Sequence, residues 1–252
     1  MTTKPRFLLI FAHPDDEAFI AAGLVCRYGA GGASFSLVSA TRGDAGGLGD
    51  PPLCTREALP ERREDELRQS ATLLGIRHIH ILDYLDKRLA DASLPKVRGE
   101  LVNIICTYRP HIVITFDSNG MNGHPDHVAI SRFTMDAVAV ARNPYGLPGS
   151  IRPYSVQRVL WTSSVAPWET TQPADLSTEP GVDFLLDVSA YKDVKAAALK
   201  LHRTQHIPIT RCFFSKSDVD DILSLETFRQ ACGPALDQVP CEDVLTGINL
   251  DH

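Results

Sequence analysis

The sequence predicts an α/β protein: a Rossmann-like, mostly parallel sheet with helices on both faces. Short apolar runs, typical of buried strands, alternate along the chain with segments of helical periodicity. The 252 residues are enough for one large domain with a full core, so we expect a single domain over residues 1–252. The sequence has neither a G-x-G-x-x-G dinucleotide fingerprint nor a Walker-type phosphate loop, so we expect no bound dinucleotide.

The first expected unit is a strand, a helix and a second strand. An apolar run predicts a strand at residues 6–12, and a helix is expected from residue 16 or 17 to about residue 28, where glycines end it. Residues 34–39 form the second strand. Two strands joined by a helix indicate a parallel pair with a right-handed crossover.

The pattern continues through the rest of the chain. Residues 41–52 are a glycine-rich loop whose backbone can approach a ligand closely. Strands are then expected at 78–82, 111–116, 156–163 and 182–188. Helices are expected at 61–74, 97–108, 125–140, 192–202 and 219–231. The polar, proline-rich residues 166–180 predict a mobile loop at the rim of a site.

Composition excludes several classes of protein. The net charge of −6 argues against nucleic-acid binding, which needs a basic face. No apolar run reaches the ~20 residues that a membrane span requires. The apolar run near the start is too short for a signal peptide. Six scattered cysteines, none in a C-x-x-C pair, are typical of free thiols, so we expect a cytoplasmic enzyme. Whether the protein forms a homo-oligomer stays open.

Two polar clusters follow strands that lie far apart in the chain. Residues 12–17 read Ala-His-Pro-Asp-Asp-Glu, and residues 124–127 read His-Pro-Asp-His. The carboxyl ends of parallel strands open onto the same edge of a sheet. We therefore expect both clusters to meet around one metal ion.

The spacing within each cluster suits a divalent cation. Two histidines and one carboxylate leave an open position for water, as in a catalytic rather than a structural zinc site. A cation bound by Asp16 would also relieve its repulsion with Asp15. Two alternatives stay open. Asp15 or Asp16 could be an N-cap of the helix, and Glu17 could be a first-turn residue favoured by the helix dipole.

These motifs resemble the LmbE-like/PIG-L family of zinc-dependent deacetylases, which remove acetyl groups from N-acetylglucosaminyl conjugates. The resemblance extends over most of the chain. It includes Thr-Arg-Gly-Asp at residues 41–44, the helix carrying Arg63 and Glu66, Asp86, and His-Arg-Thr-Gln at residues 202–205. It implies a Rossmann-like fold without a dinucleotide, and a small amino-sugar conjugate as substrate.

The resemblance also implies roles at the reacting centre. It makes His13, Asp16 and His127 the ligands of Zn²⁺, with Fe²⁺ as the alternative. Asp15 becomes the general base. His124 becomes the group that stabilises the oxyanion and protonates the leaving amine.

Three further residues receive roles outside this centre. Arg63 and Asp86 resemble the arginine and aspartate that hold the sugar; the alternative is a surface ion pair and a turn cap. Asp126 is expected to orient a histidine without itself binding the metal ion. Two rival functions stay open: a metal hydrolase of another amide, a carbamate or a phosphoester, and a non-catalytic sugar-binding protein. A serine hydrolase is excluded because no G-x-S-x-G elbow occurs.

Overall fold

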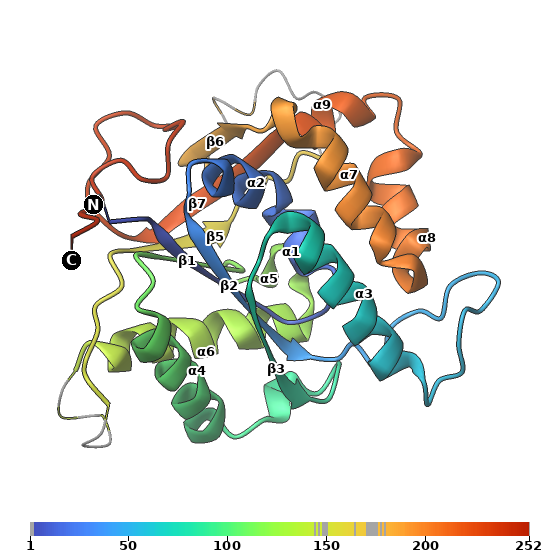
Figure 1. The fold of residues 1–252 in the computed structure, drawn as a ribbon, viewed down its shortest axis with the longest axis horizontal. Coiled ribbons are helices and arrows are strands. Elements are labelled where there is room, and N and C mark those ends of the chain that lie inside the picture. Colours follow the sequence, from blue (N-terminus) through green and yellow to red (C-terminus); the bar gives the residue numbers. More distant parts are fainter. Residues whose placement is uncertain are drawn as a thin grey trace.

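The fold is a seven-stranded mixed sheet between layers of helices, seen in a computed structural model (Figure 1). The structure describes residues 3–143, 145, 147, 151–163, 165–169, 176, 178 and 180–251. Across the sheet the strands are β3 (His78–Tyr84), β2 (Ser34–Thr41), β1 (Arg6–Phe11), β4 (Ile112–Thr115), β5 (Arg158–Thr162), β7 (Leu225–Cys232) and β6 (Phe184–Asp187).

The five strands from β3 to β5 are parallel, and β7 is antiparallel to both of its neighbours. The predicted fold class, a mostly parallel sheet flanked by helices, is therefore confirmed. β1 lies inside the sheet and pairs with β2 on one side and β4 on the other. Both faces of β1 are covered, which is why its residues 7–11 are all apolar and buried.

Helices cover both faces of the sheet. Figure 1 shows α4 and α6 on one face, and α2, α3 and α7 on the other. The helices are α1 (Asp16–Ile20), α2 (Ala22–Ala30), α3 (Leu59–Leu74), α4 (Leu94–Tyr108), α5 (Gly120–Gly123), α6 (Pro125–Ala141), α7 (Lys192–Leu201), α8 (His206–Ile209) and α9 (Val219–Ser224). Short 3₁₀ turns occupy Leu89–Asp91, Ser189–Tyr191 and Arg203–Gln205, and a π-helical turn occupies Thr210–Phe214. Within the described residues, no helix is both long enough and apolar enough to cross a membrane.

The helix expected at residues 16–28 is broken at Ala21, which separates α1 from α2. A buried carboxylate explains the break. Glu226 on β7 accepts hydrogen bonds from the backbone amides of Gly23 and Leu24, each at 2.8 Å. These amides at the start of α2 would otherwise have no partner, so the carboxylate caps the helix. Lys195 Nζ lies 2.9 Å from the same carboxylate.

The helix predicted at residues 219–231 is wrong. Only Val219–Ser224 is helical, and Leu225–Cys232 forms β7 between β5 and β6. Hydrogen bonding to two neighbouring strands outweighs the helical pattern of this segment. Part of the predicted rim loop, residues 170–175, 177 and 179, lies outside the described residues.

Candidate active site

A cavity of about 570 Å³ opens at the carboxyl ends of β1 and β4. The backbone after β1 turns directly into α1, and the backbone after β4 turns through α5 into α6. Because the two strands are paired, the two polar clusters line the same cavity. The convergence expected from the sequence is therefore present.

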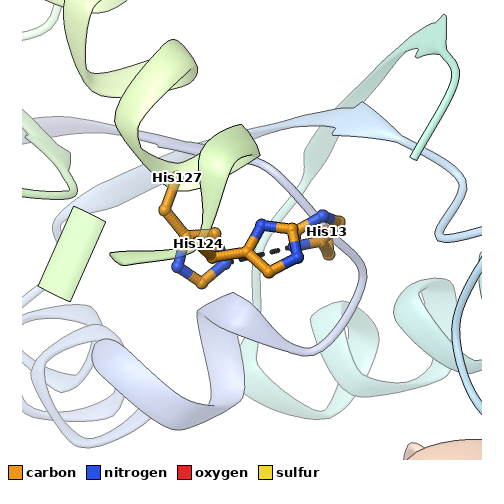
Figure 2. A group of neighbouring side chains, drawn as sticks. All are labelled: His13, His124 and His127. Carbon is orange, nitrogen blue, oxygen red and sulfur yellow. Dashed lines mark hydrogen bonds between the residues drawn. The ribbon is translucent and has the colours of Figure 1, made fainter. Parts of the chain in front are cut away.

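Three imidazoles face one another in this cavity (Figure 2). His13 Nδ1 lies 3.2 Å from His127 Nε2, although the two residues are 114 positions apart. The ring centroid of His124 lies 4.8 Å from those of both His13 and His127. Each of the three offers a nitrogen within 4.8 Å of the others, which is close enough to share a metal ion.

Asp16 approaches the same point with one carboxylate oxygen. Its Oδ2 accepts hydrogen bonds from the amides of Ala12 and His13, at 3.1 and 2.8 Å. Oδ1 lies 3.6 Å from His127 Nε2, and Oδ2 lies 3.7 Å from His13 Nδ1. Zinc ligands at 2.0–2.1 Å in a tetrahedron are about 3.3 Å apart. The nitrogens of His13 and His127 have this separation, and one oxygen of Asp16 lies near each of them. Among the described residues, His13, His124 and His127 form a group that could hold a metal ion with one atom from each side chain.

The pKa values of these side chains are strongly shifted from their usual values. Burial opposes protonation of His13, but hydrogen bonds with Asp126 and Asp86 and the charge on Asp16 raise its pKa to about 10. Burial, together with His13 and His124, holds the pKa of His127 far below its usual value. Burial raises the pKa of Asp16 to about 7. A positive charge is thus favoured at this point, and a divalent cation would replace the proton there.

Asp15 stands beside the candidate ligands but is held by different contacts. It is the N-cap of α1 and has a left-handed backbone, with φ 113°. Its Oδ2 accepts a hydrogen bond of 3.1 Å from Arg63 Nη2. The Arg63 guanidinium also donates to the carbonyls of Gly43 and Pro14. Burial raises the pKa of the Asp15 carboxyl, and the charge of Arg63 opposes that rise.

Asp86 and Asp126 both reach the far nitrogen of His13. Asp86 Oδ1 and Asp126 Oδ2 each lie 3.1 Å from His13 Nε2. Asp126 also accepts hydrogen bonds from the amides of Lys87 and Leu89, so it is fixed in place. Asp126 thus bonds a histidine, and its role in orienting that ring stays a prediction. Asp86 lines the cavity as a sugar contact should, but it also binds His13, which the sequence did not indicate.

The sequence reasoning missed the apolar wall of the cavity and the contacts behind Asp15. The wall comprises Phe19, Ile20, Met121, Trp168 and Pro208. Single apolar residues from separate elements leave no motif, so no signal in the sequence identifies them. Behind Asp15, His202 bonds Glu17, which in turn accepts from the Asp15 amide. The sequence signalled His202 through its place in the His-Arg-Thr-Gln motif.

Known proteins resemble this chain over most of its length. The family model "PIG-L: GlcNAc-PI de-N-acetylase" matches residues 8–138, which hold all the predicted site residues. The chain is 33% identical to a 1D-myo-inositol 2-acetamido-2-deoxy-alpha-D-glucopyranoside deacetylase of Thermobifida fusca, over 91% of this chain and 93% of that protein. It is 32% identical to the deacetylase of the same name from Mycobacteroides abscessus, over 81% and 82%. The chain therefore belongs to the PIG-L family.

Solved structures share the fold. The conserved protein TT1542 of Thermus thermophilus superposes with a TM-score of 0.70 at 25% identity, covering 94% of this chain and 97% of that one. An N,N'-diacetylchitobiose deacetylase from Pyrococcus horikoshii gives 0.70 at 22% identity, covering 90% and 84%. A 4-carboxy-2-hydroxymuconate hydratase, GalB, gives 0.69 at 17% identity, covering 93% and 99%. Because a hydratase shares this fold, the function must be argued from the site.

Proposed function

We propose that this protein is a metal-dependent hydrolase that removes the N-acetyl group from an N-acetylglucosamine-type conjugate. The products are acetate and a free amine. The observation that carries the proposal is the grouping of two imidazoles, a carboxylate and a separate second carboxylate at one end of the cavity. The relatives, named as deacetylases of an acetamido-glucopyranoside, support the same reaction.

His13, Asp16 and His127 are the proposed ligands of the cation, which is Zn²⁺ or Fe²⁺. Asp16 is favoured over His124 as the third ligand because the amides of Ala12 and His13 fix its carboxylate. When bound, such a cation lowers the pKa of water and polarises the acetyl carbonyl. Asp126, fixed by backbone amides, holds His13 Nε2 and so presents Nδ1 to the cation.

Asp15 is the proposed general base. It lines the cavity, is not one of the proposed ligands, and is held by Arg63. Its burial raises its pKa, which makes the carboxylate a better acceptor for the proton of the attacking water. Arg63 keeps this carboxylate oriented while the proton moves.

His124 is the proposed donor to the oxyanion and then to the leaving amine. The backbone amide of Asp126 donates to His124 Nδ1 at 3.2 Å. The neutral ring therefore carries its proton on Nε2. Burial and the neighbouring His13 lower the pKa of the His124 imidazolium. In the neutral form, Nε2–H can donate a hydrogen bond to the oxyanion; once the ring has taken up a second proton, it passes that proton readily to the leaving amine.

The sugar is proposed to bind between Asp86 and Arg63, in the cavity that the apolar wall also lines. Both side chains lie beside the proposed ligands, so a sugar held by them would place its N-acetyl group at the reacting centre. The carboxylate of Asp86 can accept from a sugar hydroxyl in addition to its contact with His13.

The test combines metal analysis with acetate release from several N-acetylglucosamine conjugates. Asp15→Ala should keep the metal and lose activity, whereas Asp16→Ala and His127→Ala should lose both. His78→Ala, at an exposed position on β3, is the control and should change neither. If Asp15→Ala strips the metal while Asp16→Ala retains it, the two aspartates have been assigned the wrong way round. If the loaded protein cleaves carbamates or phosphoesters but releases no acetate, the reaction is a different hydrolysis.

A further inference from the structure

We propose that Glu17, Ser70 and His202 are positioning residues that hold the backbone of Asp15 in the conformation its catalytic role requires. The inference rests on the proposed function, because it assumes that Asp15 is the base. None of these three described side chains lines the cavity, so they act through Asp15 rather than on the substrate.

The backbone of Asp15 needs such support. Its φ of 113° and ψ of −28° lie in the left-handed region, which residues other than glycine rarely adopt. Its carbonyl accepts hydrogen bonds from the amides of Ala18 and Phe19, at 2.9 and 3.1 Å. Its own amide donates to Glu17 Oε2 at 3.1 Å. A strained conformation persists only where its surroundings hold it, and Glu17 holds the amide side.

Glu17 is itself fixed by two further donors. Its Oε1 accepts a hydrogen bond from Ser70 Oγ at 2.6 Å and lies 2.7 Å from His202 Nε2. The Glu17 residue is only 1% exposed. A buried carboxylate is stable only when donors surround it, and here three separate segments supply them.

Helix α3 connects these contacts to the catalytic centre. Arg63, Glu66 and Ser70 lie on one buried face of the helix. Arg63 binds the carboxylate of Asp15, and Ser70 binds Glu17. Between them, Glu66 accepts hydrogen bonds from the amide and hydroxyl of Thr204, at 3.1 and 2.7 Å, which fixes the turn that follows His202. One helix face thus holds Asp15 by its side chain directly and by its backbone through Glu17.

The test compares Glu17→Gln with a matched control, Glu226→Gln. Both carboxylates are buried, and both accept backbone amides and pair with a basic side chain. Only Glu17 contacts Asp15. Amide hydrogen exchange, metal content, melting temperature, KM and kcat should be measured for both variants in the metal-loaded protein.

Glu17→Gln should speed exchange at the Asp15 amide roughly tenfold or more, because a charge-assisted hydrogen bond is weakened. It should lower kcat roughly 10- to 100-fold, with metal content and KM unchanged, since misplacing a reacting group by about 1 Å costs rate rather than binding. Glu226→Gln should lower the melting temperature and speed exchange at Gly23 and Leu24, but leave kcat unchanged.

The proposal is overturned if the Asp15 amide stays protected in Glu17→Gln, or if both variants lose kcat in proportion to their melting temperatures. Ser70→Ala removes one donor with a smaller risk to folding and should show the same direction of change in exchange and in kcat. If the wild-type protein releases no acetate from any conjugate, the proposed function fails. Exchange at Asp15 still decides whether Glu17 holds its backbone.

Discussion

A methyl group at Gly43 should disable the site without touching any proposed ligand. Gly43 has φ +67°, and a Cβ built on it would overlap the guanidinium of Arg63. Arg63 is only 3% exposed and donates to Gly43, Pro14 and Asp15, so it cannot swing into solvent without losing those contacts. Gly43→Ala therefore displaces the group that orients the proposed base.

The cost has two parts. An alanine in the left-handed region costs about 1–2 kcal/mol. Displacing the guanidinium sacrifices at least one hydrogen bond to a charged group, about 1.5–3 kcal/mol. The sum, about 2.5–5 kcal/mol, corresponds to a fall of about 5–20 °C in melting temperature for a chain of this size. If the Asp15 contact is the one lost from the transition state, kcat/KM falls roughly 10- to 150-fold.

Gly75→Ala is the matched control. Gly75 has φ +80°, and a Cβ there would meet nothing within 4 Å. An alanine at this position adds backbone strain but displaces no side chain. The melting temperature should therefore fall by only about 2–8 °C, with kcat/KM unchanged. Thermal melts and acetate release should be measured for both variants as metal-loaded protein. Equal losses of activity in the two variants would refute the role assigned to Arg63.

Three further outcomes are expected. The pKa of His13 is about 10, so a cation that binds at neutral pH must displace its proton. The affinity for the cation, measured by metal titration, should therefore rise about tenfold per pH unit from pH 7 to 9. The slope should steepen below pH 7, where Asp16 also protonates; a flat profile would contradict both shifts. Asp126→Asn weakens the hold on His13 and should reduce metal affinity about 10- to 100-fold, measured against a chelator; unchanged affinity would exclude an orienting role. Lys195→Met leaves the buried Glu226 without its cationic partner, which should cost about 3–5 kcal/mol of unfolding free energy in denaturant melts. A loss below about 1 kcal/mol would show that the amides of Gly23 and Leu24, or water, compensate the charge.

Much of the fold was predictable because strands and helices alternate regularly in the first 141 residues. The strand predictions at residues 6–12, 34–39 and 111–116 fall within two residues of the observed bounds. The break at Ala21 and the strand Leu225–Cys232 were missed because both depend on contacts far apart in the sequence. Glu226 caps α2 from β7, and β7 pairs with β5 and β6. A contact between residues about 200 positions apart leaves no local periodicity to read.

The convergence of the two histidine clusters was predictable because parallel strands fix which ends meet. Their roles remain predictions. The residues that surround Asp15 were not predictable in the same way. From the sequence, Glu17 could be interpreted as an acidic residue in the first turn of a helix. In the structure it also binds Ser70 and His202, which lie 53 and 185 positions away. Such contacts depend on how α3 and α7 pack, which the sequence pattern does not state.

The position of β7 has a consequence for truncated forms of the protein. This strand pairs with β5, and β5 covers β4, so a fragment that stops after α6 lacks both strands and leaves β4 as an open edge. That fragment would still carry every proposed ligand, but not the histidine that secures Glu17. We therefore expect the first 141 residues to retain some affinity for a cation, to aggregate through the bare strand, and to show no turnover.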